Sequence, residues 1–126
     1  MRECQFSAIY TRPNAGGAQS TVIYNAAWMP FGGVKGFTSG LDNLASSFGY
    51  DSDYRVNAVK VGIGTLDRSL AWTGETLDKL TNNLDATQTE TLAYTPAHRL
   101  ASASGKYGTL FSLYDGAGNR TSKTTE

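Results

Sequence analysis

The sequence predicts an all-β protein made of tandem antiparallel β-hairpins that form an open, curved strip of sheet. A unit consisting of an aromatic residue, a turn and a returning strand recurs along the chain, led by Tyr50, Trp72, Tyr94 and Tyr114. The steps between these aromatics are 22, 22 and 20 residues, and self-similarity at such a period is typical of repeat proteins. The 14 glycines among 126 residues, together with frequent Thr, Ser and Tyr, favour turns and strands over helices.

The clearest copy of the unit is the segment 113–121, Leu-Tyr-Asp-Gly-Ala-Gly-Asn-Arg-Thr. Its tyrosine closes one strand, its aspartate opens the turn by accepting backbone amides, small residues make the turn, and the arginine starts the next strand. Less regular copies occupy 50–56 and 94–100, and a stretched copy runs from Trp72 to Leu80. The residues that define the repeat are therefore Tyr50, Asp51, Arg55, Trp72, Tyr94, Arg99, Tyr114, Asp115 and Arg120.

A charged pair is expected across the turns that begin with aspartate. The arginine five or six positions after the aromatic lies across the hairpin from that aspartate, as in Asp51 with Arg55 and Asp115 with Arg120. An exposed pair of this kind contributes only about 0–1 kcal/mol to stability. Thr73 and Thr95 hold the aspartate position in the other copies and can accept backbone amides more weakly. The unit therefore specifies a turn and does not require any chemistry.

The first part of the chain, 1–43, is expected to hold strands of a degenerate repeat. A strand over 3–10 precedes a turn at 13–17, and alternation of side chains over 20–25 indicates a second strand. The pattern loosens from 25 to 43, where Pro30 and several glycines interrupt it. Only a short strand around 34–38 is predicted there.

The repeat region proper is 44–126. Alternation with a period of two predicts outgoing strands over 44–50, 66–72, 90–94 and 110–114, and returning strands over 55–63, 79–83, 99–104 and 120–125. The apolar side chains change face near Ala58 and Val59, which indicates a β-bulge there. Leu77, Leu80 and Leu84 also have helical spacing, so a helix over 75–83 is the competing interpretation.

The composition argues against several classes of protein. Acidic and basic residues balance at 11 each, so the chain lacks the basic surface typical of nucleic-acid or anionic-membrane binding. No apolar run approaches the ~18 residues of a membrane-spanning helix, and 1–12 lacks the features of a secretion signal. Cys4 is the only cysteine, so neither an internal disulfide nor a paired zinc motif is expected. No cofactor or metal is predicted.

No active site is predicted either. His98 is the only histidine, and with Cys4 and an aspartate it supplies the residue types of a catalytic triad, but these residues are scattered and His98 falls in a turn. The glycines at 32–36 lack the spacing of a phosphate-binding loop. Asp51 with Asp53 lacks the glycine and the distal glutamate of a calcium loop. The chain is therefore not expected to be an enzyme.

The segment 114–122, Tyr-Asp-Gly-Ala-Gly-Asn-Arg-Thr-Ser, resembles the YD repeat of the Rhs (rearrangement hot spot) family. The resemblance covers 44–125 and extends more loosely over 18–43, where 24–27 is similar to an earlier copy, with Met29 where the arginine would stand. It implies a long spiralling strip of hairpins that closes into a hollow shell, which in bacteria encloses a C-terminal toxin. The chain is too short to close a shell, so it resembles a slice of one. It also lacks a match to the Asp-Pro-containing segment at which the family's core cleaves itself.

Two functions are therefore expected as alternatives. The resemblance implies a structural segment of a secreted or cell-surface bacterial Rhs-type polymorphic toxin, whose partners are neighbouring repeats of a longer parent chain, toxin cargo, or other copies that pair through exposed edge strands. The alternative is a module that binds carbohydrate or a cell-surface partner by stacking Trp28 and Trp72 on sugar rings. The competing interpretation of both tryptophans is that they belong to a half-buried column between stacked hairpins.

Overall fold

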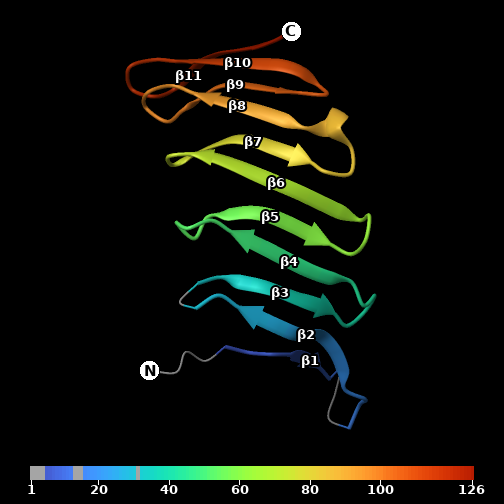
Figure 1. Cartoon of the computed structure of the whole chain (residues 1–126). Coiled ribbons are helices and arrows are strands. Elements are labelled where there is room, and N and C mark those ends of the chain that lie inside the picture. The colour runs from blue at the N-terminus through green and yellow to red at the C-terminus, as the bar shows by residue number, and fades with distance from the viewer. Residues whose placement is uncertain (1–4, 13–15, 31) are drawn as a thin grey trace. The chain divides into compact units, whose positions relative to one another are not determined.

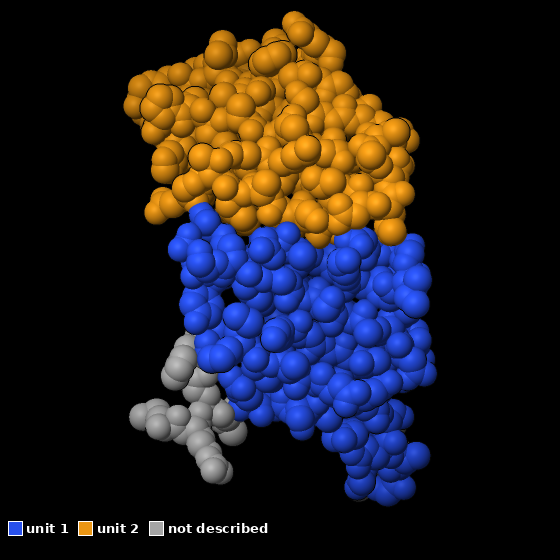
Figure 2. All heavy atoms as spheres, viewed as in Figure 1, with its two compact units in different colours: residues 1–67 blue, residues 68–126 orange. Residues whose placement is uncertain are grey.

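The computed structural model of the chain describes residues 5–12, 16–30 and 32–126. These residues form two compact units, Met1–Asp67 and Arg68–Glu126 (Figure 2). The boundary expected after residue 43 lies inside the first unit, between two strands. The described strands are β1 (Ile9–Thr11), β2 (Ser20–Trp28), β3 (Val34–Ser39), β4 (Ala45–Tyr50), β5 (Val56–Val61), β6 (Leu66–Thr73), β7 (Thr76–Asn82), β8 (Glu90–Tyr94), β9 (Leu100–Gly105), β10 (Gly108–Tyr114) and β11 (Arg120–Thr125).

In each unit the strands pair antiparallel with their neighbours in the chain, as the succession of hairpins in Figure 1 shows. The only described helical segment is the short 3₁₀ turn η1 (Ala86–Gln88). The order of strands is linear in each unit, so neither sheet closes on itself. The predicted fold class, an open all-β array of tandem antiparallel hairpins, is confirmed.

The bounds of the elements agree with most of the predicted strands and correct others. The segment 75–83 contains the strand β7 and is not a helix. Strand β2 continues to Trp28, where the sequence pattern had loosened. Asn25 explains the loosening, because its φ of 54° places an irregularity inside the strand, between the pairs made by Tyr24 and Ala27. Residues 1–4 and 13–15, parts of the first predicted strand and turn, lie outside the described residues.

A β-bulge recurs beside the leading aromatic of every hairpin. Tyr50 pairs with Val56 but Gly49 pairs with Ala58, so Asn57 is the extra residue on the returning strand. The bulge predicted near Ala58 and Val59 is therefore real but begins earlier. The equivalent extra residues in the other hairpins are Lys35, Asp78, Ala101 and Thr121. The sequence revealed one of these five bulges, because only β5 carries enough apolar residues for the change of face to be visible.

The bulge also explains why β7 resembled a helix in the sequence. Leu77 pairs with Trp72 and Leu80 pairs with Leu70, with Asp78 as the extra residue between them. Because Trp72 and Leu70 are two residues apart on one strand, they share a face, and so do Leu77 and Leu80. Two residues that are three apart on the returning strand thus lie on the same face of the sheet when the extra residue of the bulge falls between them. The same relation holds for the pairs Val56 and Val59, Leu100 and Ala103, and Arg120 and Lys123.

The sheets have very little buried interior. Ala103 is the only buried hydrophobic side chain among the described residues, at 5% exposure, and it lies on β9 between β8 and β10. Larger side chains are half-buried along one face, as where the rings of Phe37 and Phe48 lie 6.3 Å apart. Stability therefore rests on contacts between neighbouring strands, which is typical of repeat arrays.

The long turns share one pattern of backbone hydrogen bonds. In the turn that begins at Asp51, its N–H donates to the Arg55 carbonyl (2.9 Å) and the Tyr54 N–H donates to the Asp51 carbonyl (3.1 Å). Turns with the same two bonds begin at Met29, Thr95 and Asp115. The fourth residue has a positive φ in three of them: Tyr54 (61°), His98 (56°) and Gly118 (94°). Only glycine adopts this conformation without steric cost.

The turn after Trp72 is shorter than the others, and not stretched as the sequence suggested. Thr73 pairs with Thr76, so only Gly74 and Glu75 form the loop. Gly74 has a φ of 56°, which suits the first position of a two-residue hairpin loop. Leu77, rather than Lys79, therefore stands opposite the leading aromatic.

The strained turn position gives a first prediction. Replacing His98 by glycine removes the steric cost of its positive φ and should raise the free energy of unfolding by about 0.5–1 kcal/mol, after allowing for the greater flexibility of unfolded glycine. The neighbouring substitution Ala97→Gly is the control and should lower it by about the same amount. Denaturant unfolding at pH 8, where histidine is ordinarily neutral, measures both. Equal effects of the two substitutions would contradict the assignment of strain to His98.

Candidate functional site

Side-chain hydroxyls connect consecutive hairpins along the edge that carries the long turns. Tyr50 Oη donates to the Val34 carbonyl (2.7 Å), Tyr94 Oη to the Leu77 carbonyl (3.1 Å) and Tyr114 Oη to the Leu100 carbonyl (2.9 Å). In each case the tyrosine closes one hairpin's outgoing strand, and the acceptor is the first or second residue of the returning strand of the hairpin before it. We call these bonds the hairpin links.

The acceptors of the hairpin links occupy one equivalent position. Val34 pairs with Trp28, Leu77 with Trp72 and Leu100 with Tyr94. Each hydroxyl thus reaches the carbonyl that stands opposite the aromatic of the preceding hairpin. The repeated geometry shows that the aromatic residue sets the register between one hairpin and the next. The sequence identified the three tyrosines as leading residues of the repeat, but it predicted neither the bonds of their hydroxyls nor a backbone acceptor.

Trp28 heads an earlier copy of the repeat. Its Nε1 donates to the Phe6 carbonyl (2.9 Å), and its ring packs edge-on against Phe6 with the centroids 5.0 Å apart. The turn after it, from Met29, has the same backbone bonds as the later turns. The earlier copy inferred at 24–27 was therefore placed wrongly, and Tyr24 instead donates to Asn43 Oδ1 (2.8 Å). The signal was present in the sequence, since Trp28 precedes Tyr50 by the same 22 residues.

Asp51 and Arg55 form the predicted ion pair. Arg55 donates from Nε to Asp51 Oδ2 (2.8 Å) and from its backbone N–H to Asp51 Oδ1 (2.9 Å), and its Nη2 lies 2.9 Å from Asp53 Oδ2. Partial desolvation raises the pKa of Asp51, but the hydrogen bonds and charge of Arg55 and the Asp53 N–H outweigh it and hold the pKa below its ordinary value. The Arg55 guanidinium is therefore bound to Asp51 and Asp53, the two carboxylates that a calcium loop would use to bind its ion.

The last turn uses an asparagine where Asp51 uses an arginine. Asn119 donates to Asp115 from its backbone N–H (2.8 Å) and its Nδ2 (3.0 Å). Hydrogen bonds from the Asn119 side chain and backbone hold the pKa of Asp115 below its ordinary value. Arg120 instead pairs with Tyr114, at the position of Leu100 in the hairpin before. No ion pair joins Asp115 to Arg120 in the described part of the chain, which corrects the expected pair.

Arg99 reaches the next turn rather than closing its own. Its N–H donates to Thr95 Oγ1 (3.2 Å), while its Nη1 donates to the Asp115 carbonyl (3.3 Å) and its guanidinium carbon lies 5.8 Å from the centre of the Tyr114 ring. Gly118 adopts its positive φ without the steric cost of a side chain, and a Cβ there would stand 2.6 Å from Nη2, so the Arg99 side chain would have to shift. Arg99 therefore reinforces the link between two hairpins.

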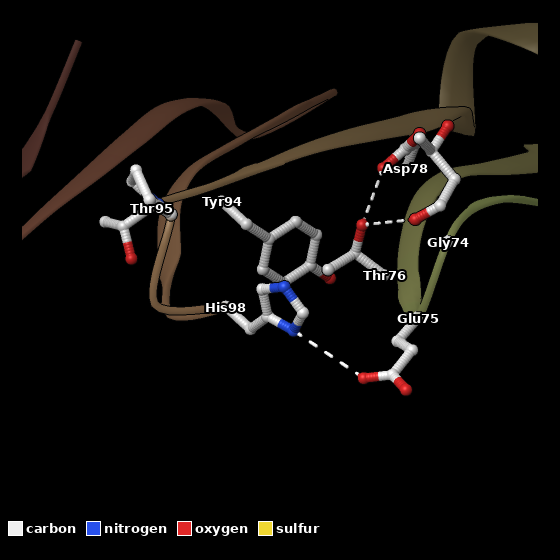
Figure 3. A pocket seen from close by; sticks show the side chains of 9 residues that line it. Gly74, Glu75, Thr76, Asp78, Tyr94, Thr95 and His98 are labelled. Carbon is white, nitrogen blue, oxygen red and sulfur yellow. Dashed lines mark hydrogen bonds and ion pairs between the residues drawn. The ribbon is translucent and has the colours of Figure 1, made fainter.

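A cleft of about 580 Å³ lies between the turns at 73–76 and 95–98 (Figure 3). His98 and Glu75 face each other across it, with His98 Nδ1 3.8 Å from Glu75 Oε2, and both side chains are exposed. Thr76 Oγ1 donates to the Thr73 carbonyl (2.9 Å) and lies 3.3 Å from Asp78 Oδ1. A similar hollow of about 410 Å³ lies between the next two hairpins. A cleft of this kind therefore lies between both of these pairs of successive hairpins.

The cleft shows no arrangement for covalent catalysis. In the described residues, His98 makes no hydrogen bond to a hydroxyl or thiol, and Cys4 lies outside them. The residues that the structure describes contain no group of three potential metal ligands. None of the helical segments among them has the length and hydropathy to span a bilayer.

The tryptophans proposed for sugar stacking lie within the repeat. Trp28 and Trp72 are half-buried, and each closes the outgoing strand of its hairpin. Trp28 uses both its ring edge and its N–H within the molecule. No geometry among the described residues favours stacking on a sugar, so carbohydrate binding stays a prediction.

The fold and the hairpin links define a tandem β-hairpin repeat protein. Comparison with protein-family models and with curated proteins finds no match to this chain.

The hairpin links predict a specific cost for losing one hydroxyl. Tyr94→Phe leaves the Leu77 carbonyl without this donor and should lower the free energy of unfolding by about 1–2 kcal/mol. The exposed Tyr107, whose hydroxyl has no partner in the described residues, supplies the control, and Tyr107→Phe should change stability by less than about 0.5 kcal/mol. Urea unfolding followed by circular dichroism measures both. Equal losses would show that the hydroxyl of Tyr94 does not link the hairpins.

The turn aspartates predict a dependence of stability on pH. Because the pKa values of Asp51 and Asp115 are lowered in the folded protein, their stabilisation is present above the ordinary aspartate pKa of about 3.9 and is lost as pH falls through the lowered values. Asp115→Asn should therefore reduce stability at pH 7, and the difference from the native chain should shrink below about pH 3. Glu75→Gln, at an exposed turn, should have little effect at either pH. A deficit in Asp115→Asn that does not vary with pH would contradict this account.

Proposed function

We propose that this chain is a structural repeat segment of a bacterial Rhs-type polymorphic toxin, where it contributes hairpins to a β-shell that encapsulates a C-terminal toxin. The observation that carries the proposal is the set of hairpin links at Tyr50, Tyr94 and Tyr114. Each link joins the same two positions of successive hairpins, so the same contact can be repeated along a longer strip. The motif that resembles the YD repeat is the part of the chain that makes these contacts.

The low burial of side chains supports the proposal that this chain is one segment of a larger repeat array. A repeat that stacks on neighbours needs few fully buried side chains of its own, and Ala103 alone is buried among the hydrophobic side chains described. The recurring element of the architecture is the contact between hairpins, and the two clefts described above lie between successive hairpins of the second unit. These features favour a structural role over chemistry.

The proposal includes an edge strand available for pairing. In the second unit β11 is paired with β10, and no described strand pairs with its other side. Thr109 and Glu126 exchange both backbone hydrogen bonds at 2.9 Å, and bonded and unbonded pairs alternate along an antiparallel ladder. Ser122 and Thr124 therefore bond to β10, while the backbone groups of Lys123 and Thr125 face away from it. An exposed edge of this kind invites pairing with another chain.

We therefore expect the isolated chain to self-associate through β11. Lys123→Pro removes an outward N–H without removing a bond to β10, so it should return the mass measured by light scattering to that of a single chain. Lys123→Ala keeps the N–H and should associate at least as strongly, because an edge lysine discourages pairing. Far-UV circular dichroism should show β structure in all three proteins. A native chain that stays monomeric at high concentration would contradict the expectation.

A further inference from the structure

The returning strand β11 has the same place in its hairpin as β7 and β9 have in theirs. Arg120 pairs with Tyr114, as Leu77 pairs with Trp72 and Leu100 with Tyr94. The carbonyls of Leu77 and Leu100 each accept the hydroxyl of the next tyrosine. In the described part of the chain, no aromatic hydroxyl or indole N–H reaches the Arg120 carbonyl. The acceptor position of one hairpin link is thus present without its donor.

The backbone directs the Arg120 carbonyl toward the open edge of β11. The Asp115 N–H bonds to the Asn119 carbonyl (3.0 Å), so the next pair, Tyr114 with Arg120, is one whose backbone groups do not bond each other. The same order holds in the preceding hairpin, where the Thr95 N–H bonds to the Arg99 carbonyl (2.8 Å) before the pair of Tyr94 with Leu100. There the outward Leu100 carbonyl meets Tyr114. The Arg120 carbonyl therefore matches the Leu100 carbonyl in its direction as well as in its position in the hairpin.

The side chains of β11 specify the charge of the partner strand. Where β7 has Leu77 and Leu80 on one face, β11 has Arg120 and Lys123. On the strand that follows β7, the residue opposite Leu80 is Glu90. Opposite charges facing each other across two strands stabilise the pairing. On a strand that pairs with β11, an acidic residue at the position equivalent to Glu90 would therefore complement Lys123. That residue would come four residues before the position equivalent to Tyr94.

We propose that the open edge of β11 is a docking site for one further hairpin of the same repeat. Its outgoing strand runs antiparallel to β11, carries an acidic residue opposite Lys123, and ends four residues later in a tyrosine or tryptophan that donates to the Arg120 carbonyl. The proposal rests on the proposed structural role and adds the chemistry by which the partner is recognised. Phenylalanine at the last position would lack the donor.

The test uses the full chain extended after Glu126 by a second copy of its own residues 84–105. The extension preserves register, because Tyr94 follows its acceptor Leu77 by 17 residues and the appended copy of Tyr94 follows Arg120 by the same number. It also places the appended copy of Glu90 opposite Lys123. Amide hydrogen exchange measured by NMR at Lys123 and Thr125 should slow by about tenfold or more relative to the chain without the extension, because these N–H groups gain partners. Ser122 and Thr124, already bonded to β10, are internal references.

Three variants of the extension separate its contributions. Replacing the appended tyrosine by phenylalanine should reduce the protection of Lys123 and Thr125 about fivefold, because one hydrogen bond is lost. Replacing the appended glutamate by lysine should reduce it as well, since like charges would then face each other. A scrambled extension of the same composition should give none. Exchange at Lys123 and Thr125 unchanged by the intact extension would overturn the docking site, and equal protection by the tyrosine and phenylalanine forms would overturn the hydroxyl rule.

A failure of this docking site can be distinguished from a failure of the proposed function. A chain that is monomeric in light scattering but accepts the extension would contradict the expected self-association while supporting this site. A chain that associates but leaves the extension unpaired would overturn the site alone.

Discussion

The bond from an aromatic side chain to a backbone carbonyl of the preceding hairpin is the contact on which the rest of this architecture depends. The described residues provide almost no buried core, so each hairpin must obtain its stability from its neighbours. Ladder hydrogen bonds fix the distance between strands but would also permit a shift in register. A hydroxyl at a defined position favours one register, because it bonds to one particular carbonyl of the preceding hairpin.

The turn, the bulge and the link work together as one device. The turn closes the hairpin immediately after the aromatic, and the extra residue that follows, such as Asn57 or Ala101, restores the pairing beyond it. The pair beside the turn has backbone groups that face outward, and it is this pair that supplies the acceptor of the next link. Tyr54 and His98 adopt a positive φ at the fourth position of their turns, which is a strained conformation for residues other than glycine.

Much of the repeat region could be predicted from the sequence, because period-two alternation and turn residues are local signals. Tyr50, Tyr94 and Tyr114 were identified as leading residues, and their strands lie where expected. The bulges at Asp78, Ala101 and Thr121 could not be predicted, since an extra residue has no preferred side chain. The arginine expected to pair with Asp115 was the wrong partner, because Asn119 makes the contacts in the last turn. The carbonyl acceptors carry no sequence signal at all.

Because every acceptor in the links is a main-chain atom, the side chain at that position is free to change. Val34, Leu77 and Leu100 serve equally, although they belong to hairpins with different turns. At position 28 the donor is a tryptophan, whose Nε1 also donates to a backbone carbonyl, that of Phe6. As far as this hydrogen bond is concerned, hairpins of this kind are compatible modules, because the acceptor carbonyl is present whatever side chain stands at its position. Such an array can lengthen by duplication while its individual copies diverge in sequence.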